Sequence, residues 1–305
     1  MEIIRNPIRR VADFYHDRFF FKQLYRLAAP IALQNLLTAS LGMVASVMVG
    51  QLGDAAIASV GLAGQVFFLL NLILFGIGSG SAMFTAQLWG KKDIVSLHKV
   101  LGLCLAMGIA VASFFLISCE LFPTRIIGIF TVDPQVIALG SEYLRIYAVA
   151  FLFFSITSGF ASVLRSVGEV KLPMLVTVSA LALNIALNYI LIFGALGFPA
   201  MGIRGAAISA VIARVAECLV LVLITYWKKY PVASRINELL GLNLGFFVKI
   251  FKPVFPVILN ELLWSLGVTV YSVVYARIGT PSIAAMNIVA TVDNLALVPF
   301  MGLST

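Results

Sequence analysis

Glu261 stands alone as a charge in a long apolar stretch, VILNELLWSLG (257–267). The nearest basic residues are Lys252 and Arg277, which a helix would place roughly 13 Å and 24 Å away along its axis. An ionisable group inside an apolar helix costs about 2.5–3.5 kcal/mol on insertion scales, so its presence points to a function. The carboxyl could bind and release a proton, hold Na⁺ with neighbouring oxygens, or stay protonated and hydrogen-bond to another helix.

Amide side chains also stand at helical spacing in apolar stretches. Gln34 and Asn35 follow Pro30, which removes one backbone hydrogen bond and permits a bend that serves either packing or movement. Asn184 and Asn188 are four residues apart and therefore share one helix face. They could hydrogen-bond to another helix or contribute oxygen atoms to a cation site.

Two acid–base pairs inside apolar stretches have a spacing of three residues. Glu142 and Arg145 can pair within one helical turn, and so can Arg214 and Glu217. We expect mutual neutralisation to be the role of both pairs. Asp293 lies early in a further apolar stretch and could face either the membrane interface or a cavity.

The remaining reactive side chains form no pattern for catalysis or metal binding. His16 and His98 lack partners at ligand spacing. Cys104, Cys119 and Cys218 lie in or at the ends of apolar stretches, so we expect small packing residues. The sequence thus predicts a protein that is not an enzyme and has no cofactor.

The composition shows which elements must position these residues. Of the 305 residues, 61% are hydrophobic and 11% are charged, against about 45–50% and 25% in soluble domains. A membrane-spanning helix needs about 20 apolar residues. The sequence therefore predicts an all-α polytopic membrane protein with spans at about 27–50, 58–87, 98–120, 136–162, 172–196, 204–227, 249–276 and 282–305.

Basic residues gather on alternate connections between these spans. Lys91 and Lys92 lie on the second connection, Lys228 and Lys229 on the sixth, and six Lys or Arg in the first 26 residues. Lys and Arg favour the cytoplasmic side, so we expect a cytoplasmic N-terminus with 1–26 as an amphipathic lead on an inner membrane. A surface for nucleic acid would not alternate in this way.

A shift of 226 residues aligns two segments without gaps. It pairs Pro30 with Pro256, and Asn35 with Glu261. Further matches are Leu36–Leu37 with Leu262–Leu263, Ser46–Val47 with Ser272–Val273, Gly53 with Gly279, Ile57–Ala58 with Ile283–Ala284, and Gly76 with Gly302. Pro256 therefore becomes a second candidate hinge beside Pro30.

The repeat restarts after six spans, so both copies face the same way, as in transporters with parallel repeats. It predicts a two-lobed helix bundle: a complete six-helix first lobe at 27–227, a cytoplasmic linker at 228–248, and the first two helices of a second lobe at 249–305. We expect four further spans to be missing after Thr305.

Several stretches are similar to the multidrug and toxic compound extrusion (MATE) family of efflux transporters. They are MVGQLGDAAIASVGLA (48–63), AQLWGKKD (86–93), LRSVGEVKLPM (164–174), NIALNYILIFGALGFPAMGIRGAAISAVIAR (184–214) and YARIGTPSIAAMNI (275–288). The resemblance covers nearly all of the chain after the first 20 residues.

The resemblance implies a secondary active antiporter that exports organic cations or drugs in exchange for Na⁺ or H⁺. It implies alternating access through a cavity between two lobes and bending of the first helix. We expect a monomer that acts on small cationic molecules. A flippase for lipid-linked saccharides is the alternative within the same superfamily, and a shortened, inactive fragment is the second alternative.

Carried over residue by residue, the resemblance matches neither family pattern at its acids, and Glu261 is the candidate because it is an isolated carboxylate, one turn from the family's position. The branch with a first-lobe cation site has an aspartate where Ala45 stands, a further acid near Asn188 and a threonine where Ala210 stands. The branch with a second-lobe carboxylate has its acid about one turn deeper, where Trp264 stands. We therefore expect Glu261 to alternate between coupling cation and substrate.

Overall fold

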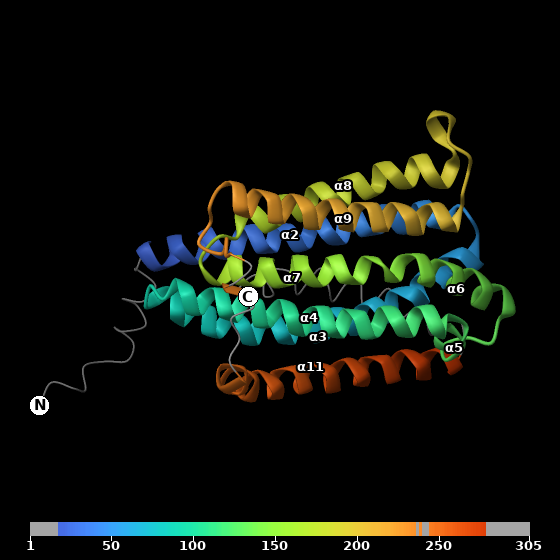
Figure 1. The fold of residues 1–305 in the computed structure, drawn as a ribbon. Helices are drawn as coiled ribbons and strands as arrows, with labels where there is room; N and C mark the ends of the chain where they lie inside the picture. The colour runs from blue at the N-terminus through green and yellow to red at the C-terminus, as the bar shows by residue number, and fades with distance from the viewer. Residues whose placement is uncertain (1–17, 236–237, 240–243, 279–305) are drawn as a thin grey trace, which may run out of the picture.

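The computed structural model describes residues 18–235, 238–239 and 244–278 of the chain (Figure 1). All long elements within these residues are α-helices, which confirms the predicted fold class. They are α2 (Arg18–Gly50), α3 (Asp54–Gly90), α4 (Ile94–Leu121), α5 (Pro123–Gly128), α6 (Pro134–Ala148), α7 (Ala150–Ser166), α8 (Lys171–Phe193), α9 (Ile203–Trp227) and α11 (Leu244–Ile278), with a 3-10 turn, η1 (Ala195–Gly197), after α8.

Helix ends follow local signals in the sequence. Asp93 caps α4 by accepting a hydrogen bond from the backbone N–H of Ser96 at 3.0 Å. Asp133 caps α6 in the same way, with the N–H of Gln135 at 2.8 Å. Such caps use N–H groups that have no partner inside the helix. Gly194 ends α8 with a φ of 74°, a left-handed conformation that glycine adopts without strain.

The helix lengths agree with a chain that crosses a membrane several times. Six described helices are long and apolar enough to span a bilayer, and α6 with α7 would form a seventh span as a bent pair. These seven correspond to the first seven predicted spans. The predicted span 282–305, with Asp293, lies outside the described residues.

The predicted span at 136–162 is formed by a bent pair of helices, a feature that its apolar run does not reveal. α6 and α7 meet at an angle of 49°, and the N–H of Val149 bonds to the carbonyl of Tyr147 instead of one four residues back. Tyr147 and Phe151 are buried on either side of the bend, with ring centroids 5.6 Å apart and nearly perpendicular planes. These two rings pack against each other across the bend.

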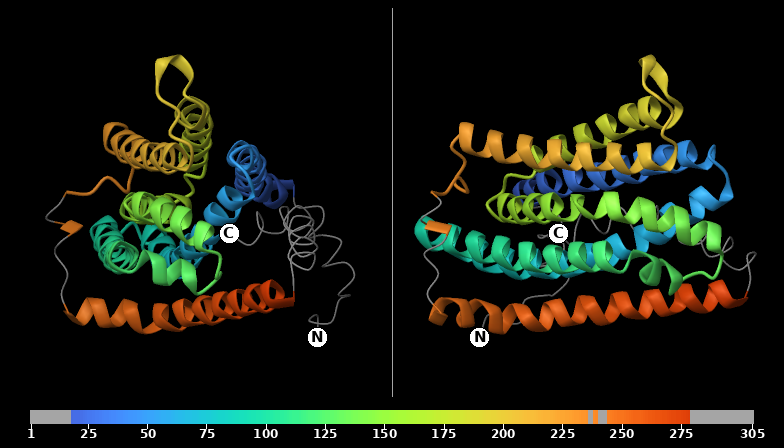
Figure 2. Two further views of the ribbon diagram at one scale, coloured as in Figure 1. Left: turned by 90° about the vertical axis from the view of Figure 1, so that its right-hand side faces the viewer. Right: turned by 45° about the vertical axis from the view of Figure 1, so that its right-hand side comes forward.

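The bundle is layered, with α3, α4 and α7 between two outer groups (Figures 1 and 2). α8, α9 and α2 lie on one side, and α11 lies on the other, packed against α3. Gly76 and Gly80 permit this close approach: a Cβ at Gly76 would lie 3.0 Å from the Cα of Ile258, and one at Gly80 would lie 2.7 Å from a methyl group of Val254. Small residues commonly bring membrane helices together.

Each of the two repeated segments contains one long helix, α2 (Arg18–Gly50) in the first and α11 (Leu244–Ile278) in the second. Pro30 lies inside α2, whereas α11 contains both Pro253 and Pro256. The proposed hinge roles of Pro30 and Pro256 stay predictions.

Candidate functional site

A buried ion pair lies in the middle of the first lobe. Arg214 and Glu217 are one turn apart on α9, and Nη1 of Arg214 donates to Oε2 of Glu217 at 2.6 Å. The Glu217 side chain is 2% exposed and that of Arg214 is 21% exposed. Thr177 on α8 donates to Oε1 of Glu217 at 2.8 Å. Both carboxylate oxygens therefore have a donor, and the predicted pairing within α9 is confirmed.

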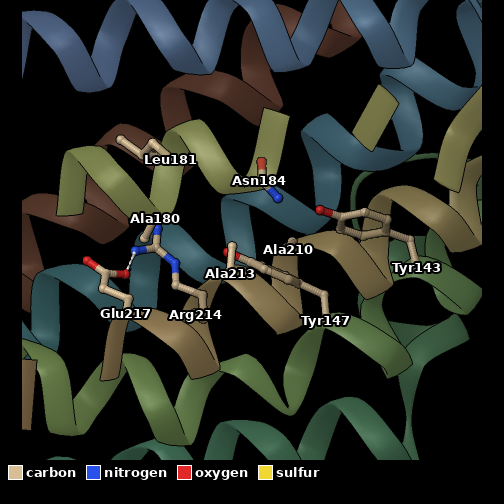
Figure 3. A pocket seen from close by; sticks show the side chains of 9 residues that line it. All are labelled: Tyr143, Tyr147, Ala180, Leu181, Asn184, Ala210, Ala213, Arg214 and Glu217. Atoms are coloured by element: carbon tan, nitrogen blue, oxygen red, sulfur yellow. Dashed lines mark hydrogen bonds and ion pairs between the residues drawn. The ribbon is translucent and has the colours of Figure 1, made fainter. Parts of the chain in front are cut away.

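Aromatic rings surround the guanidinium of Arg214. Its Cζ lies 5.6 Å from the ring centroid of Phe67 on α3 and 5.0 Å from that of Phe154 on α7. Tyr147 on α6 points its hydroxyl end toward Arg214 (Figure 3). Ring faces attract a cation within about 6 Å, so α3, α6 and α7 help hold a charge that α9 carries.

The ion pair borders a cavity of about 160 Å³ between α6, α8 and α9 (Figure 3). The lining residues are Tyr143, Tyr147, Ala180, Leu181, Asn184, Ala210, Ala213, Arg214 and Glu217. Polar groups therefore meet in one cavity from the neighbouring helices α8 and α9 and from α6, which lies earlier in the chain. Tyr143 and Tyr147, four residues apart, form the one signal that could have revealed the α6 contribution.

The two asparagines of α8 lie on one face, as their spacing predicts. Asn188 donates from Nδ2 to Oδ1 of Asn184 at 3.4 Å, and Asn184 donates to Oγ of Ser209 at 3.5 Å. Ser209 on α9 in turn hydrogen-bonds to Oδ1 of Asn188, which is 3% exposed. These contacts tie α8 to α9, and Asn184 also borders the cavity.

The predicted pair of Glu142 and Arg145 is wrong. Glu142 pairs with Arg204 at the start of α9. Arg145 is exposed and lines a separate cavity of about 320 Å³ that Glu120 also borders. The i,i+3 spacing permits a pair with Arg145. However, α6 packs against α9, and this packing brings Arg204 within reach of Glu142.

The amides of α2 stand apart from this cluster. Gln34 and Asn35 are half-buried, and neither side chain has a hydrogen bond to another of the described residues. α2 packs mainly against α8. Their predicted role in binding a cation stays a prediction.

Glu261 is half-buried on α11, outside the first-lobe cluster. It follows Ile258 by three residues and therefore lies on nearly the same helix face, the face that approaches Gly76 of α3. Among the described residues, no hydrogen bond or ion pair reaches its carboxylate. Residues 18–235, 238–239 and 244–278 also contain no group of three metal-binding side chains.

A contact that sequence spacing could not predict lies at the end of the bundle where α3 meets α4. Nδ1 of His98 lies 2.8 Å from Oε2 of Glu238, and Nε2 lies 2.9 Å from the carbonyl oxygen of Pro231. Val232, between these partners in the connection after α9, is fully buried. His98 therefore fixes part of the predicted inter-lobe linker to α4.

Known proteins resemble this chain in sequence. The probable multidrug resistance protein NorM of Thermotoga maritima is 28% identical over 290 residues, which cover 93% of this chain and 61% of that protein. NorM of Rhizobium meliloti is 31% identical, with coverage of 93% and 61%. The multidrug export protein MepA of Staphylococcus aureus is 28% identical, with coverage of 88% and 58%. The chain thus spans about 60% of the length of these relatives.

Solved structures share the fold. An outward-facing multidrug resistance MATE family transporter of the MOP superfamily superimposes with a TM-score of 0.80 at 22% identity, over 92% of this chain and 62% of the other. A MOP superfamily transporter from Pyrococcus furiosus has a TM-score of 0.79 at 21% identity, with the same coverage.

One family model covers more than half of the sequence. The model described as MatE matches residues 30–190, a region that includes α3, α4, α6 and α7 in full. Together with the relatives and the shared helical fold, this match shows that the chain is a multi-pass membrane protein that belongs to the MATE family.

Proposed function

We propose that this chain belongs to a secondary active antiporter that exports small organic cations in exchange for Na⁺ or H⁺ by alternating access. Relatives named as multidrug resistance or export proteins support the activity. We further propose that it acts as a monomer in the inner membrane, has a cytoplasmic N-terminus, and needs no cofactor beyond the coupling ion. The alternation of basic connections supports this orientation.

The observation that carries the proposal is a contrast between carboxylates in membrane-spanning helices. Glu217 is neutralised by Arg214, and Glu142 pairs with Arg204. Among the described residues, Glu261 has no such partner. An ionisable group in a membrane span without a fixed counter-charge is the group most free to exchange a proton, Na⁺ or an organic cation.

The position of Glu261 also suits a group that responds to helix movement. It lies next to the contact of α11 with α3, which belong to different copies of the repeat. A change in how these helices pack would change the polarity around the carboxylate. Cation release and substrate binding could therefore be tied to movement between lobes.

The flippase alternative receives less support from the described arginines. A pyrophosphate group needs several free cationic side chains, whereas Arg214 is paired with Glu217. Arg145 shares its cavity with Glu120. Both cavities therefore hold a single arginine with a carboxylate beside it.

The decisive experiment measures transport of a fluorescent organic cation. The 305-residue chain is reconstituted in liposomes, and ethidium transport is followed under imposed Na⁺ and H⁺ gradients. We expect gradient-driven transport that Glu261→Gln lowers at least about tenfold, since the variant removes the exchangeable charge. Asn260→Ala, a change at the neighbouring exposed position, should retain transport.

Two results would contradict the proposal. Undiminished transport by Glu261→Gln would exclude this carboxylate as the coupling group. An absence of transport under either gradient, with correctly folded protein, would show that this chain is inactive alone and would favour the inactive-fragment alternative.

A further inference from the structure

Glu217 lies in surroundings that resemble a cation-binding site. Its carboxylate receives the hydroxyl of Thr177, and the side chains of Asn184 and Tyr147 border the same cavity. Carboxylate, hydroxyl and amide oxygens are the ligands that hard cations prefer. Yet the group that contacts the second carboxylate oxygen is the guanidinium of Arg214.

We propose that Arg214 is a built-in cation of the first lobe. Its guanidinium permanently occupies the position on Glu217 where a mobile Na⁺ or proton would otherwise bind. The first lobe then holds a fixed, neutral pair, and exchange of charge is left to Glu261 on α11. Only this last clause rests on the proposed transport function.

The covalent tether is the first reason. Arg214 and Glu217 are three residues apart on α9 and meet at 2.6 Å. A free ion that dissociates from a site diffuses away. The guanidinium of Arg214 is tethered to the adjacent turn, so its effective concentration beside Glu217 stays high. With Thr177 on the other oxygen, each Glu217 oxygen already has a donor, and the position beside Oε2 is taken by the guanidinium.

The aromatic surroundings are the second reason. Phe67 and Phe154 lie within 5.6 Å and 5.0 Å of the guanidinium carbon, and they come from α3 and α7. A guanidinium is planar and weakly hydrated, so it stacks on aromatic rings more readily than an ammonium group does. Two helices outside α9 therefore hold the charge of Arg214 over Glu217.

The burial of Glu217 is the third reason, because it predicts what happens without Arg214. Glu217 is 3% exposed, and a buried carboxylate without a partner favours its protonated form. The other titratable groups that face it are Cys218 on its own helix and Tyr147 on α6. Neither supplies a positive charge. Loss of Arg214 should therefore create a site for a proton or Na⁺.

The test uses Arg214→Met, which removes the charge and keeps most of the side-chain length. The melting temperature Tm of the purified 305-residue chain is measured across pH, in NaCl and in choline chloride of equal concentration. The wild type should show no preference for Na⁺ through Glu217. The variant should be stabilised either by Na⁺ or by acid. If a proton binds, the folding equilibrium constant should rise by up to about tenfold for each unit by which the pH falls, the slope for one proton.

A second substitution assigns the new dependence to Glu217. The double variant Arg214→Met with Glu217→Gln should lose the added dependence on Na⁺ and pH. Arg204→Met is the matched control, because it removes an arginine from the same helix but from an exposed ion pair. It should not acquire any such dependence.

The outcomes are separable from those of the transport assay. If Arg214→Met shows the same pH and salt response as the wild type, or if the double variant keeps the new response, the inference is overturned. If Arg214→Met does not fold, the double variant should still fold, because it leaves no buried charge; its failure would also overturn the inference. A Glu261→Gln variant that transports normally would refute the proposed function and leave the role of Arg214 intact.

Discussion

His98 has a hydrogen-bond partner for each ring nitrogen, and both partners are oxygens. One is the carboxylate of Glu238 and the other is the carbonyl of Pro231. A carbonyl oxygen only accepts a hydrogen bond, and so does an ionised carboxylate. Both oxygens lie within hydrogen-bond distance of the ring, so this one residue of α4 contacts two points of the connection after α9.

The carboxyl of Glu238 makes this attachment sensitive to pH. Its pKa is held below its ordinary value, first by the hydrogen bond from the backbone N–H of Arg235 and then by the contact with His98. A carboxyl with a lowered pKa in the folded state stabilises that state above its ordinary pKa, about 4.3. The contribution is lost as the pH falls through the folded-state value.

Hydrogen exchange of the connection after α9 should report this attachment. We expect Glu238→Gln to raise exchange of the backbone amides around Val232 at pH 7 about severalfold, because one of two attachment points is weakened. The wild type should lose the same protection as the pH falls below about 4. Mass spectrometry, corrected for the intrinsic pH dependence of exchange, provides the measurement.

Asp93 supplies a control for this experiment. Its pKa is also lowered, first by its hydrogen bonds with Ser96, but it caps α4 and does not contact the connection. Asp93→Asn should therefore leave exchange around Val232 unchanged. If both variants change exchange equally, the attachment does not depend on Glu238.

At the scale of elements, the contact between α3 and α11 depends on glycines, which have no side chain and so let the two helices approach closely. Gly76 faces the backbone of Ile258, which cannot move away as the end of a flexible side chain can. Gly64, on the same helix, has open space where its Cβ would stand. These two glycines therefore separate the effect of a lost contact from the effect of changing a helical glycine.

We predict that Gly76→Leu destabilises the chain by about 1–3 kcal/mol, the range for inserting extra volume into a packed contact. Thermal unfolding in detergent checks this value. Gly64→Leu should leave the Tm near that of the wild type or raise it slightly, since leucine favours a helix more than glycine does. Equal Tm values for the two variants would show that α11 does not pack on α3 at this point.

At the scale of the whole molecule, the helix order and the basic connections together predict an orientation in the membrane. The connection after α3 contains Lys91 and Lys92, whereas that before α6 contains the highly exposed Val132. One helix, α4, and the short α5 separate these connections. They should therefore lie on opposite sides of the membrane, with the basic one in the cytoplasm.

Labelling of single introduced cysteines tests this orientation. In intact cells, a maleimide that cannot cross the membrane should label Val132→Cys strongly and Lys92→Cys only after the cells are opened. Background should be low because Cys104, Cys119 and Cys218 are buried. The reverse labelling pattern would place the N-terminus outside and contradict the proposed topology.

The sequence by itself determined the features that depend on neighbours along one helix. Apolar runs of sufficient length defined the membrane spans, and spacings of three and four residues predicted the Arg214–Glu217 pair and the shared face of Asn184 and Asn188. Such features follow from a period of 3.6 residues per turn.

Only the tertiary structure decided which distant residues meet. Glu142 pairs with Arg204 and not with Arg145, and His98 contacts Glu238. The fourth predicted span is bent near its middle. These partners are 62 and 140 residues apart, and no periodic pattern relates them. Contacts of this kind depend on how helices pack against one another, so their charges and rings become neighbours only once the bundle has formed.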